Sequence, residues 1–347
     1  MNLPGGRWRL AIPVVLLGVA VGMVWWRGPD WHAVGHAFSA VKWPWVVAAI
    51  GLNLVSVVAR ALCWNTVIKQ AMPKSRPGFP LVFSAFCVGL FANVVIPGRV
   101  GEFARVAVLV RRLPRRQRAW GTLIGSVIAH RMFDLLPVTA LVIWVVVAAS
   151  LPQWAVTSIV AVLAISFAVL AFVVLAARRH QTNVREELAL SKFRNLIAQA
   201  RVGVGIMRAP LPAATAAAFQ SLGWLCQLFA VWTAMRAFDI HQHLEVAGVV
   251  LVLMNVATIF PLWPGNVGLL QAAIALPLRQ YGVRYAKGFA FGLGLQAIEA
   301  SVGVGIGLVF LAREGLSLAT LREMPTEDPD AEPPARGFEP ERARVPG

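Results

Sequence analysis

The residues best suited to chemistry lie around two matching pentapeptides. Pro97-Gly98-Arg99-Val100-Gly101 recurs 167 residues later as Pro264-Gly265-Asn266-Val267-Gly268, and both copies lie inside apolar stretches. A Pro-Gly pair ends one helix and leaves backbone N–H groups at the start of the next helix. These groups and the positive end of the helix dipole attract anions. With Arg99 beside the first break, the sequence predicts a site for a negatively charged group.

Ionisable side chains recur inside the apolar stretches, where charge is costly and faces a polar interior. Glu102 and Arg105 are three residues apart, as are Arg131 and Asp134, so each pair shares a helix face. The pattern fits internal ion pairs between helices, or a polar pathway with a surplus of one positive charge. The seven charged residues are Arg60, Arg99, Glu102, Arg105, Arg131, Asp134 and Glu299.

The second break has no ionisable residue of its own. Asn266 and Gln271 offer neutral hydrogen bonds, and Glu299 lies on the following apolar run. A glycine-rich packing point and a ligand site explain this region equally well. His130 and Asp134 are four residues apart, but further ligands at suitable spacing are missing, so we expect no metal and no cofactor. No catalytic triad, phosphate-binding loop or dinucleotide motif is present, and we predict no enzyme.

Composition indicates what must position these residues. The chain of 347 residues is 58% hydrophobic and 14% charged, which is typical of a polytopic membrane protein. The net charge of +16 comes from short basic loops between apolar runs, so a positive-inside bias explains it and no nucleic-acid partner is expected. Cys63, Cys87 and Cys226 are far apart in apolar sequence and are predicted to be small hydrophobic residues.

The apolar runs predict an all-α polytopic membrane protein with about six full spans and two re-entrant helical hairpins. Loops 65–79 and 111–118 are both basic and therefore both cytoplasmic, so residues 80–110 must enter and leave on one side. Two half-helices that meet at residues 93–101 satisfy this constraint, and 246–282 repeats the hairpin from the other side. The apolar runs are 10–26, 44–64, 80–97, 119–148, 155–177, 211–235, 246–263 and 288–312.

Residues 1–312 are predicted to form one membrane domain of two inverted halves, about 8–150 and 151–312, with both termini on the cytoplasmic side of the cytoplasmic membrane. Residues 178–209 are predicted to lie on the cytoplasmic surface as an amphipathic segment. The polar, Pro-rich stretch 313–347 is predicted to be a disordered tail. Arg279, Arg284 and Lys287 fall outside in this layout, against the charge bias.

The motifs together resemble a known family. Asn93-x3-Pro97-x3-Gly101-Glu102-x2-Arg105, Arg131-x2-Asp134 and Pro264-Gly265-x2-Gly268 are similar to the flippase-like family typified by the membrane domain of lysylphosphatidylglycerol synthetase, over about residues 8–312. The resemblance implies two re-entrant hairpins and the movement of a charged lipid between leaflets. The chain departs from the family pattern at Gln271, where relatives usually have an acid, and at Gln296, where they usually have arginine. No synthetase domain is expected.

We therefore predict a flippase-like transporter of a charged or anionic phospholipid, aminoacylated forms included. The anionic head docks at the Pro97 half-helix, with Arg99 and Arg105 as phosphate partners. The residues predicted to bind the lipid are Asn93, Pro97, Gly98, Arg99, Gly101, Glu102, Arg105, Arg131, Asp134, Pro264, Gly265, Asn266, Gly268, Gln271 and Glu299.

Two alternatives remain open. The first is a membrane transferase with a polyisoprenyl-phosphate donor and Asp30, Asp134 or Glu299 as base. It ranks lower because the loop available for an acceptor, 27–43, is short. The second is an accessory scaffold for a separate lipid-modifying enzyme.

Overall fold

Long apolar helices dominate the fold. The computed structural model describes residues 30–73, 75–96, 100–113, 116–149, 209–258 and 266–315, with Thr157 and Ala164, and these residues form helices and no strand. Four helices are long and apolar enough to cross a membrane, which confirms the all-α, multi-pass class. They are α3 (Trp43–Ala71), α6 (Arg116–Ala148, of which Trp120–Ala148 is the apolar part), α9 (Pro210–Ala237) and α12 (Tyr285–Arg313).

Several predicted features lie outside the described residues. These are the apolar run 10–26, the run 155–177 apart from Thr157 and Ala164, the surface segment 178–209, the tail after Gly315, and five predicted site residues, Pro97, Gly98, Arg99, Pro264 and Gly265.

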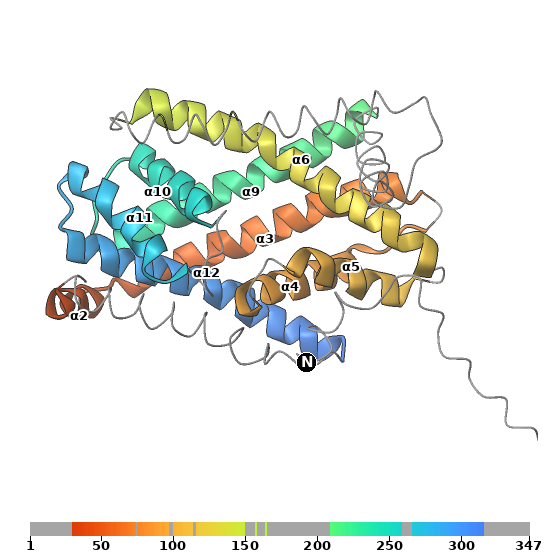
Figure 1. Cartoon of the computed structure of the whole chain (residues 1–347), viewed down its shortest axis with the longest axis horizontal. Helices are drawn as coiled ribbons and strands as arrows, with labels where there is room; N and C mark the ends of the chain where they lie inside the picture. Colours follow the sequence, from red (N-terminus) through yellow and green to blue (C-terminus); the bar gives the residue numbers. More distant parts are fainter. Residues whose placement is uncertain are drawn as a thin grey trace, which may run out of the picture.

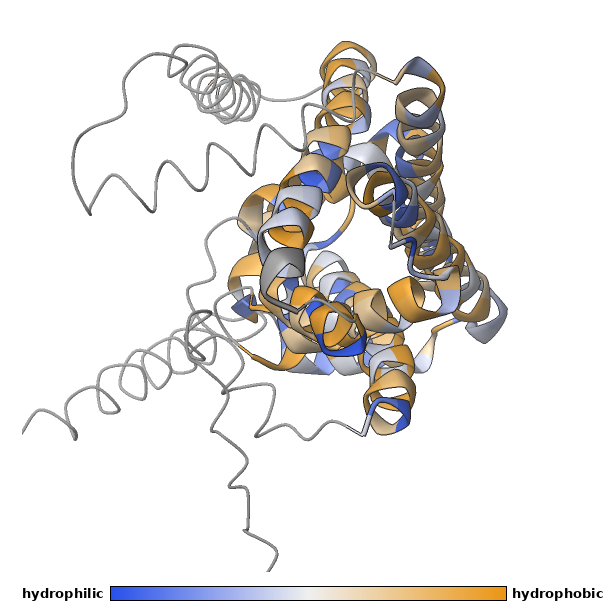
Figure 2. Cartoon of the chain, turned by 90° about the vertical axis from the view of Figure 1, so that its right-hand side faces the viewer, coloured by the Kyte–Doolittle hydropathy of each residue, from blue (hydrophilic) through white to orange (hydrophobic). Residues whose placement is uncertain are grey.

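The outer surface of the described helices is suited to lipid. Most of the ribbon of the described helices is orange in Figure 2, the colour of hydrophobic residues. Trp43, Val147 and Leu211 are among the exposed large hydrophobic side chains, with 71%, 81% and 77% of their surface accessible. Such a surface is stable against hydrocarbon and costly in water.

Proline sets the start of three helices. Pro44 in α3, Pro80 in α4 (Phe79–Val95) and Pro210 in α9 each lie in the first turn. A helix leaves its first N–H groups without an internal partner, so a residue with no N–H costs nothing there. At the other end of α9, Asp239 follows with a φ of 56°, which turns the chain out of the helix.

The start of the first short helix pair and its end both lie at the C-terminal end of α12. The stretch 80–110 is divided, as predicted, into α4 and α5 (Gly101–Arg112). Ser84 Oγ near the start of α4 donates to Glu314 Oε1 at 2.7 Å, and Arg112 at the end of α5 lies 3.1 Å from Glu314 Oε2. Because both free ends meet Glu314, the two helices run antiparallel. Glu314 belongs to the stretch 313–347, and the part of that stretch after Gly315 lies outside the described residues.

The start and the end of the second short pair lie together near the N-terminal end of α12. It consists of α10 (Leu244–Ala257) and α11 (Leu269–Leu278), followed by a 3₁₀ turn at Arg279–Tyr281. Gln242 Nε2, just before α10, donates to the carbonyl oxygen of Tyr281 at 2.9 Å, a few residues before α12 begins. The pairs α4–α5 and α10–α11 lie on opposite sides of the centre of the bundle in Figure 1.

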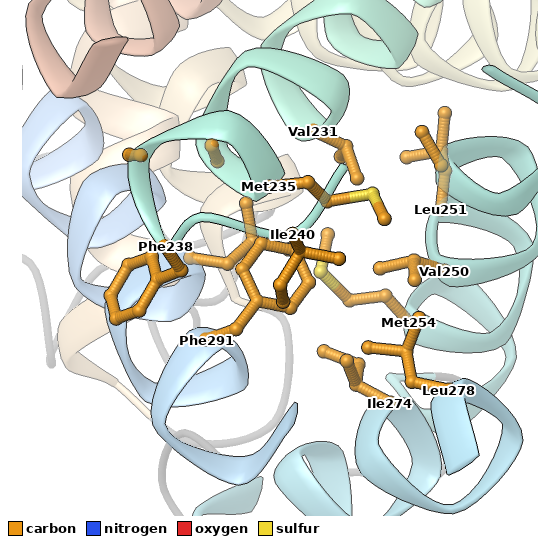
Figure 3. Close-up of a cluster of buried hydrophobic side chains, with 14 of the residues drawn as sticks. Val231, Met235, Phe238, Ile240, Val250, Leu251, Met254, Ile274, Leu278 and Phe291 are labelled. Atoms are coloured by element: carbon orange, nitrogen blue, oxygen red, sulfur yellow. The ribbon is translucent and has the colours of Figure 1, made fainter. Parts of the chain in front are cut away.

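Each short pair has its own hydrophobic core. Side chains from α9, α10, α11 and α12 converge in the cluster of Figure 3, which includes Met235, Met254, Ile274 and Phe291. A second cluster joins α3, α4, α5 and α12 around fully buried Trp64 and Leu109. Each pair is therefore packed against protein on one face.

Two glycines of α12 allow close contact with α4. A Cβ on Gly303 would lie 3.1 Å from Val94 Cγ2, and one on Gly307 would clash with Phe91 and lie 3.1 Å from the carbonyl oxygen of Cys87. Within the described part, a Cβ on Gly305 would meet nothing within 4 Å. Two of these three glycines therefore bring α12 against α4, and Gly305 does not.

One predicted loop is a helix. Residues 31–39 of the stretch 27–43 form α2 (Trp31–Ser39). The carboxylate of Asp30 accepts from the backbone N–H groups of His32 at 3.0 Å and Ala33 at 3.3 Å, so Asp30 caps α2. The apolar residues of this short stretch are spaced like a helix, but the stretch was too short to be recognised among the spans.

The turn after α9 makes folding stability sensitive to acid. Lys42 Nζ donates to Asp239 Oδ1 at 2.9 Å, and this bond is the first cause that lowers the pKa of the Asp239 carboxyl from its ordinary value, with Lys287 and His241 adding to it. A lowered pKa stabilises the fold above the unfolded-state value, about 4, and the contribution is lost as pH falls through the folded pKa.

We expect Asp239→Asn to remove this part of the pH dependence of the melting temperature measured in detergent between pH 7 and pH 3. Asparagine tolerates the positive φ at this position, so the turn is retained. The effect is small because the group is exposed. An unchanged pH profile in the variant would show that the ion pair contributes nothing to stability.

Candidate functional site

A cavity of about 410 Å³ lies where the two short pairs meet the long helices. Its walls come from α3, α4, α5, α6, α9, α11 and α12, and from described residues next to the breaks of both pairs. Seven residues predicted from the sequence line it: Asn93, Gly101, Glu102, Arg105, Arg131, Asn266 and Glu299. The remaining described candidates, Asp134, Gly268 and Gln271, hold residues of the wall in place.

Glu102 is the centre of the ionic contacts. Its carboxylate forms ion pairs with Arg105 on the same helix and with Arg131 on α6. Arg131 Nη1 also lies 3.2 Å from Asp134 Oδ2. The predicted pairs three residues apart are therefore both present, and the contact from Glu102 to Arg131 joins them into one network across α5 and α6.

The Arg105 guanidinium is enclosed by aromatic rings. Its carbon lies 4.6 Å from the centre of the Trp64 ring and 5.6 Å from that of Phe86, and only 4% of the side chain is accessible. Trp64 itself is fully buried and its Nε1 donates to Ser126 Oγ at 3.1 Å. The Trp64 ring therefore covers a buried cation.

Asp134 joins α6 to α9. Besides Arg131, its carboxylate accepts from Gln220 Nε2 and from Trp224 Nε1, the latter at 2.8 Å. The side chain is 13% accessible and does not line the cavity. Its place is therefore behind Arg131, where it fixes the position of that guanidinium.

A second polar chain also lines the cavity, and of its three residues only Glu299 belonged to the predicted site. Arg60 Nη2 donates to Gln227 Oε1, and Gln227 Nε2 donates to Glu299 Oε1 at 3.2 Å. The Arg60 guanidinium lies 5.0 Å from the centre of the Trp224 ring. The signal was present in the sequence, since Arg60 is one of the charges within the apolar runs; only the absence of a partner three or four residues away kept it out of the predicted site.

The tips of both pairs are closed by side-chain amides. Gly101 N–H donates to Asn93 Oδ1 at 2.9 Å, and Gly268 N–H donates to Gln271 Oε1 at 2.6 Å. The prediction of unpaired backbone amides is therefore wrong for Gly101, whose N–H is already capped. Gly268 has a φ of 93°, a conformation that favours glycine.

The second tip repeats the first with neutral groups. Gln271 Nε2 donates to Gln296 Oε1 on α12 at 2.6 Å, whereas at the first tip Glu102 pairs with Arg131 on α6. Asn266 Nδ2 donates to the carbonyl oxygen of Ala257 at 3.0 Å. Both tips are thus tied to a long helix by one side-chain contact, ionic in the first case and amide to amide in the second.

The described site is balanced in formal charge. It contains three arginines and three carboxylates, and the predicted surplus of one depended on Arg99, which lies outside the described residues. Within the described ranges there is no group of three potential metal ligands. The chemistry available is recognition of charge by guanidinium, amide and carboxylate groups.

Comparison with known proteins agrees with this picture. Residues 10–307 match the family described as lysylphosphatidylglycerol synthase TM region. The chain belongs to that family. The resemblance drawn from the motifs is confirmed, and the protein is a member of a membrane-protein family linked to lipid handling.

The match to a curated protein covers a smaller part of the chain than the family match does. A UPF0104 membrane protein of Pyrococcus horikoshii is 24% identical over 127 residues, which is 36% of this chain and 37% of the relative. The match thus spans little more than a third of that relative's length. No solved structure matches the chain.

Proposed function

We propose that this member of the lysylphosphatidylglycerol synthase TM-region family moves a charged or anionic phospholipid, aminoacylated forms included, between the leaflets of the cytoplasmic membrane. The observation that carries the proposal is the cavity itself. It is bounded by the tips of two interrupted helix pairs and contains side chains of Arg60, Arg105 and Arg131. Charged groups at this depth are costly unless they serve a polar ligand or pathway.

In membrane terms, we propose about six full spans and two re-entrant hairpins, with inverted halves of about 8–150 and 151–312 and both termini cytoplasmic. The order long helix, short pair, long helix occurs twice, and the two short pairs open at opposite ends of α12. Equivalent residues also meet: Ser56 Oγ donates to the carbonyl oxygen of Gly223 at 2.8 Å, with a separation of 167 residues, the spacing of the pentapeptides. Such contacts support a pseudo-two-fold axis between α3 and α9.

Glu102 acts in this proposal as an internal substitute for the ligand. Its carboxylate occupies Arg105 and Arg131, the same groups that a phosphate would use. Two oxygens of a phosphate can accept two parallel hydrogen bonds from arginine, as the two oxygens of a carboxylate do, so a phosphate can replace Glu102 there. Arg131 is 54% accessible while Arg105 is 4% accessible, so we place the entry of the headgroup beside Arg131 on α6. The acyl chains stay in the bilayer.

We infer no catalytic role for the acids considered as bases. Asp30 caps α2, and Asp134 accepts from Gln220 and Trp224 behind Arg131. Glu299 lines the cavity and accepts from Gln227. A separate lipid-modifying enzyme that supplies the lipid remains our proposed partner.

Leaflet exchange in proteoliposomes tests the proposal. With fluorescent phosphatidylglycerol and a membrane-impermeant quencher, we expect the wild type to exchange lipid well above protein-free vesicles. Arg105→Gln is expected to lower the rate about tenfold to a hundredfold, because a charge-assisted hydrogen bond contributes about 1.5–3 kcal/mol. Arg112→Gln is the matched control, since Arg112 is on the same helix but contacts Glu314 outside the cavity. Equal rates for wild type and protein-free vesicles would overturn the proposal.

A further inference from the structure

Two side chains on α3 present hydrogen-bond donors that no described group accepts. Asn53 and Arg60 are seven residues apart, on one helix face, and both line the cavity. Asn53 is 8% accessible and its Nδ2 has no acceptor among the described residues; the same holds for Arg60 Nε. A buried donor left without an acceptor costs about 1–3 kcal/mol, and more when it is charged.

Arg105 also has a buried Nε without a described acceptor, but Arg60 differs from the other arginines of the site in its ion pairing. Arg105 and Arg131 both pair with Glu102, and Arg131 also pairs with Asp134. No described carboxylate lies within 4.0 Å of the Arg60 guanidinium. Its Nη2 contacts the neutral Gln227, whose other end reaches Glu299, so the amide of Gln227 lies between the cation and the nearest acid.

The position of Arg60 within the fold is also special. Its contact with Gln227 spans 167 residues, as does that of Ser56 with Gly223. A residue that meets its own equivalent lies close to the pseudo-two-fold axis. An exchange of the two inverted halves would leave such a residue at the same depth, so a group bound to it could be approached from either side.

We propose that Arg60 and Asn53 form an axial subsite for a phosphate anion, reached from both sides of the membrane. The inference rests on the proposed function and adds the residue that holds the phosphate at mid-passage. The guanidinium Nε–H and the Asn53 amide donate to phosphate oxygens, and the Trp224 ring keeps the guanidinium in place. The chemistry is that of a phosphate ester or free phosphate, and the source is decided by the test below.

Binding is measured on the full chain in phosphate-free detergent, as the rise in melting temperature on adding a probe. The probes are phosphatidylglycerol and inorganic phosphate. We expect Arg60→Gln to weaken binding about tenfold to a hundredfold. Asn53→Leu is expected to weaken binding of the probe several-fold. It should also raise the melting temperature measured without probe, because leucine has a similar size and replaces an amide whose Nδ2 has no acceptor. If Asn53 had only a structural role, its substitution would not weaken probe binding while raising the melting temperature.

Arg236→Gln is the matched control. Arg236 also lies over a tryptophan, 4.7 Å from the Trp232 ring centre, and its Nε likewise has no described acceptor. It lies in the last turn of α9, where the helix dipole stabilises a cation, and it does not line the cavity. We expect this variant to bind both probes as the wild type does.

The outcomes separate the two proposals. A rise in melting temperature for the wild type, but not for Arg60→Gln, supports the subsite. If only phosphatidylglycerol gives this rise, the ligand is a lipid headgroup. If inorganic phosphate also gives it, the ligand is the anion itself. Equal protection of both proteins by phosphatidylglycerol overturns the subsite, as does the absence of protection by either probe. The proposed transport is judged separately by wild-type leaflet exchange, so it can stand when the subsite fails, and the reverse.

Discussion

Replacement of Glu102 by glutamine is expected to lower the stability of the protein and to strengthen its binding of anionic lipid. The carboxylate pairs with Arg105 and Arg131, and Arg105 is almost fully buried. Removing one partner of a buried ion pair leaves an uncompensated charge and costs about 3–5 kcal/mol. The contact with Arg131 adds little to this figure because that side chain is half exposed.

The same change frees the Arg105 guanidinium for phosphate and leaves Arg131 paired with Asp134 alone. We therefore expect added phosphatidylglycerol to raise the melting temperature of Glu102→Gln more than that of the wild type, in detergent at neutral pH. The double variant Glu102→Gln/Arg105→Gln is the control, because it removes both charges of the buried pair. It should recover stability and lose the additional response to lipid. A Glu102→Gln protein as stable as the wild type would show that the pair carries no net stability.

Replacement of Gly101 by alanine is expected to separate α4 from α5. A Cβ at this position would clash with the carbonyl oxygen of Gly89 and lie 2.6 Å from Asn93 Oδ1. Neither atom can move freely, since one belongs to the backbone of α4 and the other caps Gly101 itself. Overpacking of this kind costs about 1–3 kcal/mol, and loss of the cap adds about 1 kcal/mol.

Gly305→Ala on α12 is the matched control, because its Cβ would meet nothing within 4 Å in the described part. Alanine is a better helix former than glycine, so this variant should be as stable as the wild type or more stable by up to about 1 kcal/mol. Thermal unfolding of both proteins in the same detergent makes the comparison. If Gly101→Ala unfolds at the wild-type temperature, the close contact between the helices of the first pair is not required.

The sequence predicted the helices well because its signals were local. Apolar length marked α3, α6, α9 and α12, and the Pro-Gly breaks marked the division between α4 and α5. It also predicted the pair Arg131–Asp134, since a spacing of three residues brings side chains together on any helix. These features need no knowledge of how the helices pack.

Other features depend on packing and could not be read from spacing. Trp64 and Arg105 lie on different helices, and only the packing of α3 against α5 places the ring over the guanidinium. The contact from Arg60 to Gln227 joins residues 167 apart on two different helices. Gly101 N–H was predicted to be unpaired, but it donates to Asn93 Oδ1. These residues are eight apart on two different helices, so their spacing did not indicate the contact.

One mechanical consequence follows from α12. This single helix of 29 residues meets the first short pair through Gly303, Gly307 and the adjoining Glu314. It meets the second pair through Gln296. A continuous helix is stiff along its axis. As long as these contacts hold, neither short pair can shift along α12 without displacing the other pair.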